Sequence, residues 1–120
     1  MQKNLEISVL LDFYGDALTP KQREAIEFYY NEDLSLAEIA EIEGITRQGV
    51  RDNIKRGEST MTELEQKLGI AARFKRMQDS LAEIMRYARY IEQHNARYGN
   101  FNEIEQAAQK IYTLAKDLSE

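Results

Sequence analysis

The chain has 120 residues, no cysteine, one histidine and a formal net charge of −5. A chain of this length can bury one modest core, and without cysteine it forms neither disulfides nor thiolate metal sites, so we expect no metal and no cofactor. Its acidity disfavours indiscriminate binding of polyanions, and no stretch approaches the ~20 apolar residues that a membrane span needs, so the sequence predicts a cytoplasmic protein with no membrane partner.

The chain is expected to be all-α, because apolar residues recur at spacings of three and four along most of its length. A first helix is predicted from about residue 5 to a point between Asp16 and Leu18, marked by Leu5, Val9, Phe13 and Ala17 with Leu11, Tyr14 and Leu18 beside them. The next helix begins with a capping threonine, Thr19, and a proline at a position that needs no amide donor, Pro20. Gln22 completes a reciprocal capping box with Thr19.

Two helices separated by a tight turn are predicted next. Ser35 and Glu38 form a second capping box, which opens a short helix with an inner face of Leu36, Ile39, Ala40 and Ile42. Gly44 ends this helix, because only glycine adopts a left-handed backbone position at little cost. Thr46 caps the following helix, whose stripe is Val50, Ile54, Gly57, Met61, Leu64 and Leu68. Gly57 is unfavourable within a helix and Thr60 could cap a new one, so a break there is the alternative, but the unbroken phase favours a continuous helix through Gly57.

Two further amphipathic helices are predicted after Gly69. The first carries a heptad stripe of Ile70, Phe74, Met77, Leu81, Ile84, Ala88 and Ile91. The second is expected to be capped by Asn102 and Glu105, with a stripe of Ile104, Ala108, Ile111, Ala115 and Leu118. A helix over residues 70–98 would be about 40 Å long, so its stripe needs a partner. We therefore divide the chain into a helix-turn-helix unit, residues 1–60, and a helical region, residues 61–120, that forms a homodimer or contacts a partner.

Residues 35–56 have the spacing of a helix-turn-helix, in which Ala40 is small where the helices cross and Ile45 and Val50 close the wedge. Such a pair can also be purely structural. The charge distribution favours nucleic-acid binding, because residues 44–57 carry four basic and one acidic side chain, whereas residues 33–43 carry four acidic side chains and no basic one.

The candidate DNA contacts lie on the second helix of this pair: Thr46, Arg47, Gln48, Arg51, Asp52, Lys55 and Arg56. Glutamine pairs with adenine and arginine with guanine in the major groove, so Gln48 and Arg51 are the predicted base readers. Lys55 and Arg56 suit phosphate contacts. For Asp52 and Arg56, an ordinary i,i+4 salt bridge is the alternative.

No P-loop, dinucleotide fingerprint or nucleophile elbow occurs in the sequence, so we expect no enzyme and no catalytic residue. The acidic residues Glu38, Glu41 and Glu43 are interpreted as a solvated helix face rather than a metal site.

The segment LTPKQREAIEFYYNEDLSLAEIAEIEGITRQGVRDNIKR, residues 18–56, closely resembles the YlxM family of small bacterial helix-turn-helix proteins. More distantly, LAEIAEIEGITRQGVR resembles region four of bacterial sigma factors, which implies a helix-turn-helix without a wing. By similarity to the sigma pattern, Arg47, Gln48 and Arg51 occupy base-reading or phosphate-contacting positions. The sigma pattern commonly has glutamate in place of Gln48 and a neutral residue in place of Asp52.

The resemblance implies a DNA-binding transcriptional regulator. YlxM-like proteins are typically encoded beside the protein subunit of the signal recognition particle, so the resemblance also implies a link to that pathway and its components as partners. The alternative is a non-enzymatic protein or RNA adaptor of the targeting machinery, in which the long helices are the working surface.

Overall fold

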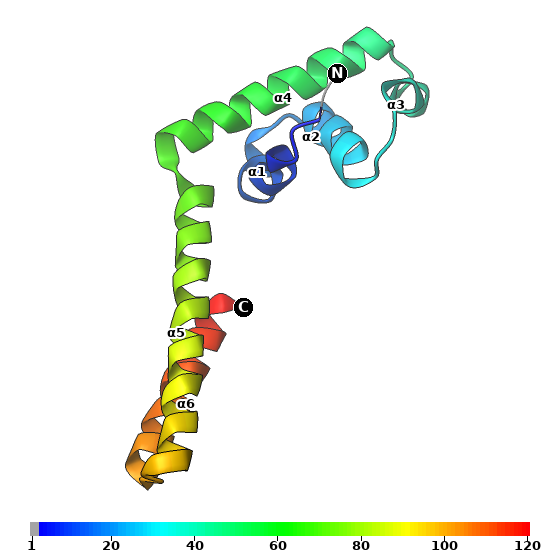
Figure 1. Cartoon of the computed structure of the whole chain (residues 1–120). Helices are drawn as coiled ribbons and strands as arrows, with labels where there is room; N and C mark the ends of the chain where they lie inside the picture. The colour runs from blue at the N-terminus through cyan, green and yellow to red at the C-terminus, as the bar shows by residue number, and fades with distance from the viewer. Residues whose placement is uncertain (1–2) are drawn as a thin grey trace. The chain divides into compact units, whose positions relative to one another are not determined.

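The structure, a computed structural model, describes residues 3–120, and this range contains helices and no strand (Figure 1). The all-α helix-turn-helix fold predicted from the sequence is confirmed. The chain divides into two compact units, Met1–Ala71 and Ala72–Glu120. The boundary placed near residue 60 falls inside a helix.

The first unit consists of six short or medium elements. They are α1 (Glu6–Tyr14), the 3-10 turn η1 (Gly15–Ala17), α2 (Pro20–Ile26), the π-helical turn η2 (Glu27–Asn31), α3 (Leu36–Glu43) and α4 (Arg47–Leu68). In Figure 1, α4 lies across α1 and α2. The fully buried side chains at the centre of this unit are Ile26, Ile39, Val50, Ile54 and Met61.

The apolar residues that marked the first helix are only partly buried. Leu11, Tyr14 and Leu18 are buried as part of the core, together with Ile7, which the prediction did not include, whereas Leu5 is 79% exposed and Val9 51%. Residues 7, 11 and 14 follow a helical stripe of their own, and the 3-10 turn after Tyr14 then tightens the chain so that Leu18 also reaches the core. Local spacing alone does not reveal that change of pitch.

Both predicted capping boxes are confirmed. The amide of Gln22 donates to Oγ1 of Thr19 at 3.2 Å, and the amide of Thr19 donates back to Oε1 of Gln22 at 3.1 Å. Ser35 and Glu38 exchange the equivalent two bonds, each 3.1 Å long. These bonds satisfy amides that the first turn of a helix leaves without intrahelical partners.

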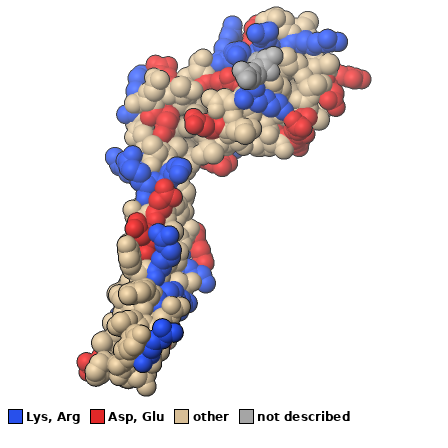
Figure 2. Space-filling view, viewed as in Figure 1, with Lys and Arg blue, Asp and Glu red and all other residues tan. Residues whose placement is uncertain are grey.

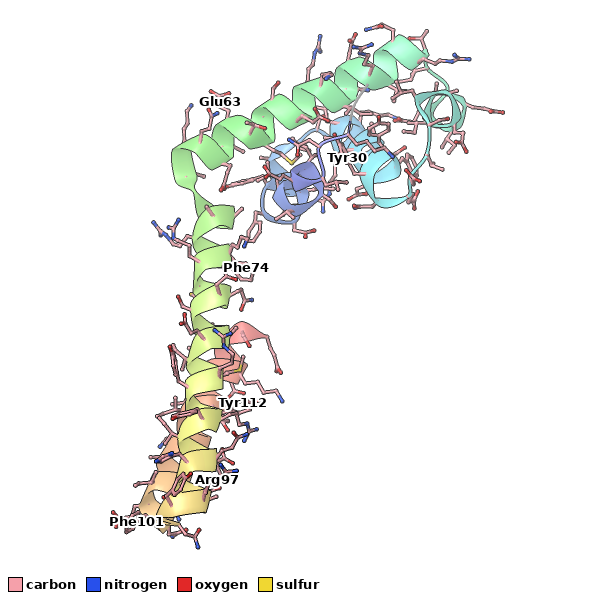
Figure 3. All side chains as sticks on the ribbon, viewed as in Figure 1. Tyr30, Glu63, Phe74, Arg97, Phe101 and Tyr112 are labelled. Carbon is pink, nitrogen blue, oxygen red and sulfur yellow. The ribbon has the colours of Figure 1, made fainter. Side chains whose placement is uncertain are left out.

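Two tyrosines tie α4 to the rest of its unit. The hydroxyl of Tyr30, labelled in Figure 3, donates to Oε1 of Glu58 at 2.5 Å, and burial together with this bond raises the pKa of Tyr30 to about 12. The hydroxyl of Tyr14 donates to Oε1 of Glu65 at 2.6 Å. Carboxylates in the second half of α4 are therefore engaged within the unit.

The second unit is a hairpin formed by α5 (Ile70–Tyr98, which begins just before the boundary) and α6 (Asn102–Ser119). The helices run antiparallel in Figure 1. Only part of each predicted stripe is buried, namely Leu81 and Ala88 on α5 and Ala108 and Ala115 on α6, and Asn95, outside the predicted stripe, is buried as well.

The cap predicted at Asn102 is wrong, because α6 begins at Asn102 and Phe101 occupies the cap position without a side-chain hydrogen bond of its own. Instead, the buried Asn95 reaches across the turn: its Oδ1 accepts from the amide of Phe101 at 2.9 Å and its Nδ2 donates to the carbonyl of Phe101 at 2.8 Å. A side chain from the preceding helix therefore satisfies the backbone at the start of α6.

Candidate nucleic-acid interface

The turn between α3 and α4 is held by backbone hydrogen bonds and one left-handed residue. Gly44 has a φ of 69°, and the amides of Gly44 and Ile45 donate to the carbonyl of Ala40 at 2.9 and 3.2 Å. Oγ1 of Thr46 then accepts from the amide of Gly49 at 2.9 Å, which caps α4. The turn and cap residues predicted from the sequence are confirmed, and they set how α4 leaves α3.

The side chains packed between α3 and α4 are closed to solvent. Val50 and Ile54 of α4 are fully buried, as is Ile39 of α3, and Ala40 is 8% exposed. Ile42, which was predicted to lie on the inner face, is 58% exposed. At 100° per residue it lies well off the line through residues 36, 39, 40 and 43, so the inner face of α3 passes it by.

Glu43, rather than Ile42, is the last residue on the inner face of α3. Both of its carboxylate oxygens are buried, without a hydrogen-bond partner among the described residues. Burial raises the pKa of Glu43, the charge of Glu24 raises it further, and Lys21 offsets part of this rise. The interpretation of this carboxylate as part of a solvated face is therefore wrong. Glu43 follows the buried Ile39 by four residues, a spacing that puts both side chains on one face of a helix, so the sequence could have predicted its inward position.

The predicted contact residues all lie on the outer surface of α4 and its cap. Thr46, Arg47, Gln48, Arg51, Asp52, Lys55 and Arg56 are exposed. Within residues 3–120, none of the four cations in this set takes part in an ion pair. Because no described carboxylate forms an ion pair with them, they remain available for an external anion.

One internal hydrogen bond crosses this surface. Nε2 of Gln48 donates to Oδ1 of Asp52 at 2.9 Å, one helical turn away. Asp52 thus turns toward Gln48, and the alternative salt bridge with Arg56 is not formed.

The basic surface ends with Arg56. Residues 57–68, the second half of α4, carry three acidic side chains and one basic one. Figure 2 shows Lys and Arg gathered at the end of the first unit where α4 begins. A polyanion would therefore meet attraction over about three turns of α4 and repulsion beyond them.

Comparison with known proteins identifies a family whose model includes the residues of this surface. Residues 1–101 match the family model UPF0122, described as "Putative helix-turn-helix protein, YlxM / p13 like". The chain belongs to the UPF0122 family. It is 47% identical over 85 residues to a UPF0122 protein of Desulforamulus reducens, covering 71% of this chain and 73% of that protein. A UPF0122 protein of Thermoanaerobacter sp. is 40% identical over 110 residues, which cover 92% of this chain and 94% of that protein.

The UPF0122 match includes the whole first unit and α5, so all the candidate contact residues lie within it. Over the residues that the structure describes in this UPF0122 chain, no helix is long and apolar enough to cross a membrane. The same residues contain no group of three His, Asp or Glu side chains that could hold a metal ion.

Proposed function

We propose that this chain binds double-stranded DNA, with the first three turns of α4 in the major groove, and acts as a transcriptional regulator in the cytoplasm. The observation that supports this most is the set of four exposed cations without acidic partners, placed on the second helix of a helix-turn-helix: Arg47, Arg51, Lys55 and Arg56. Cations of this kind release counterions from DNA without first breaking a contact inside the protein.

The packing of α4 divides the roles among these side chains. With Val50 and Ile54 buried, Gln48 and Lys55 lie on the side of α4 away from the core, at 100° per residue. Arg51 lies on one flank of that line and reads guanine in the proposed complex, while Lys55 and Arg56 contact phosphates.

Gln48 is prepared for adenine by its bond to Asp52. The bond uses one N–H of the Gln48 amide and leaves the second N–H and the carbonyl oxygen free. Those two groups are the donor and the acceptor that pair with N7 and N6 of adenine. Asp52 thereby fixes the amide before DNA arrives, which reduces the entropy lost on binding.

A second candidate function, an adaptor for protein or RNA in the signal recognition particle pathway, draws support from the exposed apolar side chains of the hairpin. Ile84, Ile91, Ile104 and Ile111 are each between 41% and 43% exposed. A patch of this kind is typical of a protein contact. The link to protein targeting itself rests on the resemblance to YlxM proteins.

Selection of bound sequences by the full chain from a random DNA pool, with a random RNA pool alongside, tests the proposal. We expect enrichment of a DNA sequence, with two half-sites about 34 Å apart or a multiple of that spacing if the protein reads DNA as a homodimer. Enrichment of RNA alone, or of neither pool, would overturn DNA binding in favour of the adaptor.

A further inference from the structure

The interior of the hairpin is thin. Its buried side chains recur every seven residues on each helix, at Leu81, Ala88 and Asn95 of α5 and at Ala108 and Ala115 of α6. Three of these five are alanines and one is polar, so little apolar surface is removed from water between the two helices. A two-helix unit of this size needs further burial to be stable.

A second apolar line lies beside the buried one on both helices. Three residues after the buried positions come Ile84, Ile91 and Tyr98 on α5, and Ile111 and Leu118 on α6. The three isoleucines are 42% to 43% exposed, and Tyr98 and Leu118 are each 70% exposed. In an antiparallel pair, positions with the same offset from the buried line lie on the same face of both helices. These five residues, with Met77 and Ile104 in the same phase, form one surface that we call the apolar face.

The opposite face of the hairpin carries charged side chains, among them Arg86 and Arg89, and already has internal contacts. The guanidinium of Arg89 lies over the ring of Tyr112, 3.7 Å from its centroid, and also donates to Glu92 at 3.0 Å. Figure 3 labels Tyr112 on α6. The hairpin is therefore two-faced, and its unburied apolar surface lies on one side.

Charged side chains line both outer edges of the apolar face. They lie two residues after positions of the buried line: Arg76, Glu83 and Arg97 on α5, and Glu103, Lys110 and Asp117 on α6. Among the residues that the structure describes, none of these six takes part in an ion pair. By helical geometry they point away from the other helix of their own hairpin, so they are open to a partner from outside it.

We propose that a second copy of this chain covers the apolar face, forming a four-helix bundle in which each α5 lies over α6 of the other copy. A two-fold axis parallel to the helices produces this arrangement. Because this axis is parallel to the helices, residues that are level within one hairpin are also level between the two copies. Two hydrogen bonds fix which residues are level: Gln78 Nε2 donates to the carbonyl of Ser119, and Asn95 Nδ2 donates to the carbonyl of Phe101.

The edge charges are complementary in that register. Arg76 lies about one turn from Asp117 of the other copy, Glu83 from Lys110 and Arg97 from Glu103. These three opposite-charge pairs outnumber one like-charge approach, that of Glu83 to Asp117. The alternative two-fold axis, perpendicular to the helices, lays α5 over the other α5. When that axis passes through the middle of the hairpin, it brings Arg76 toward Arg97 and Lys110 toward Lys110 of the other copy, so the charge pattern disfavours it there.

The size of the apolar face also fits a second copy. The exposed fractions of its side chains correspond to an area on the order of 800 Å² per copy, the size of a stable protein interface. Assembly of this kind needs no nucleic acid, so the inference stands or falls independently of DNA binding.

Sedimentation of the full chain at micromolar concentration, without nucleic acid, tests for the second copy. We expect a dimer that Ile91→Glu converts to a monomer of unchanged helix content, since Ile91 is already partly exposed within the hairpin. Arg86→Glu, a matched reversal on the opposite face, should remain dimeric. A monomeric wild-type chain, or an Ile91→Glu dimer, would overturn the proposal.

A charge swap then tests the arrangement. Lys110→Glu alone places like charges together at two symmetric sites and should raise the dimer dissociation constant about tenfold, whereas Glu83→Lys loses Lys110 but gains Asp117 as a neighbour of opposite charge and should raise it less. The two changes combined should restore it to within about twofold of wild type, because the pair is rebuilt with its signs reversed. Additive weakening in the double variant, or no effect of either single change, would overturn the proposed packing of α5 on α6.

Discussion

Gly57 of α4 packs directly on Ile26 of α2, so closely that a Cβ at position 57 would collide with Cδ1 of that buried side chain. Gly57→Ala should therefore destabilise the first unit, even though alanine favours a helix over glycine by about 1 kcal/mol. Overpacking of this kind costs typically about 1 to 3 kcal/mol. Chemical denaturation measures the net loss.

Ile26→Val is the matched partner for this test, because it removes the methyl group that the new Cβ would meet. Gly57→Ala in the Ile26→Val background should cost less than in the wild type, or even stabilise the unit. An equal loss in both backgrounds would show that the two residues do not touch.

The buried wedge of the helix-turn-helix makes a second prediction. Ile54→Ala should lower the free energy of unfolding by about 2 to 5 kcal/mol, because Ile54 is fully buried and its truncation leaves a cavity. Ile42→Ala serves as the control, since Ile42 is 58% exposed, and it should cost well under half as much. Melting curves that coincide for Ile54→Ala and the wild type would contradict the wedge.

Local chemistry in the sequence was enough to predict where most helices begin and end. Thr19, Ser35 and Thr46 cap their helices as expected, and Gly44 is left-handed. These features depend on a few neighbouring residues, so tertiary structure hardly alters them.

Which face of each helix is buried depended on packing that local spacing does not encode. Ile42 is 58% exposed, whereas both carboxylate oxygens of Glu43 are buried, and the charges that act on Glu43 belong to Glu24 and Lys21 of α2, a helix distant in the sequence. Asn95 of α5 accepts a hydrogen bond at the start of α6, a contact that the local sequence around α6 does not predict. The candidate contact residues were easier to predict, because exposure of charged side chains is the default.

Glu43 makes the stability of the first unit depend on pH. Its pKa is raised in the folded state, so its ionisation costs stability: the cost is absent below the ordinary carboxyl pKa and grows as the pH rises through the raised value. Glu43→Gln should therefore unfold at higher denaturant concentration than the wild type near neutral pH. At about pH 3.5 the two midpoints should converge.

Glu41→Gln, at an exposed position of the same helix, is the control for Glu43→Gln and should change the midpoint little at either pH. A Glu43→Gln variant less stable than wild type at neutral pH would mean that the ionised carboxylate is favourably bound.

Substitution of Arg51 distinguishes sequence-specific base contacts from non-specific attraction to DNA. Arg51→Ala should weaken binding to the selected sequence by about 1 to 3 kcal/mol and leave binding to unrelated DNA nearly unchanged. Competition between the two DNAs measures the difference. Equal loss on both sequences would reassign Arg51 to a phosphate contact.

The salt dependence of DNA affinity tests most directly whether α4 holds DNA. In the full chain, Lys55→Gln with Arg56→Gln should lower the slope of log affinity against log salt by about one for each lost phosphate contact, on every DNA sequence. Lys75→Gln with Arg86→Gln, which removes the same charge from α5, should leave the slope unchanged. Identical slopes for the wild type and the Lys55/Arg56 variant would contradict DNA binding by this helix.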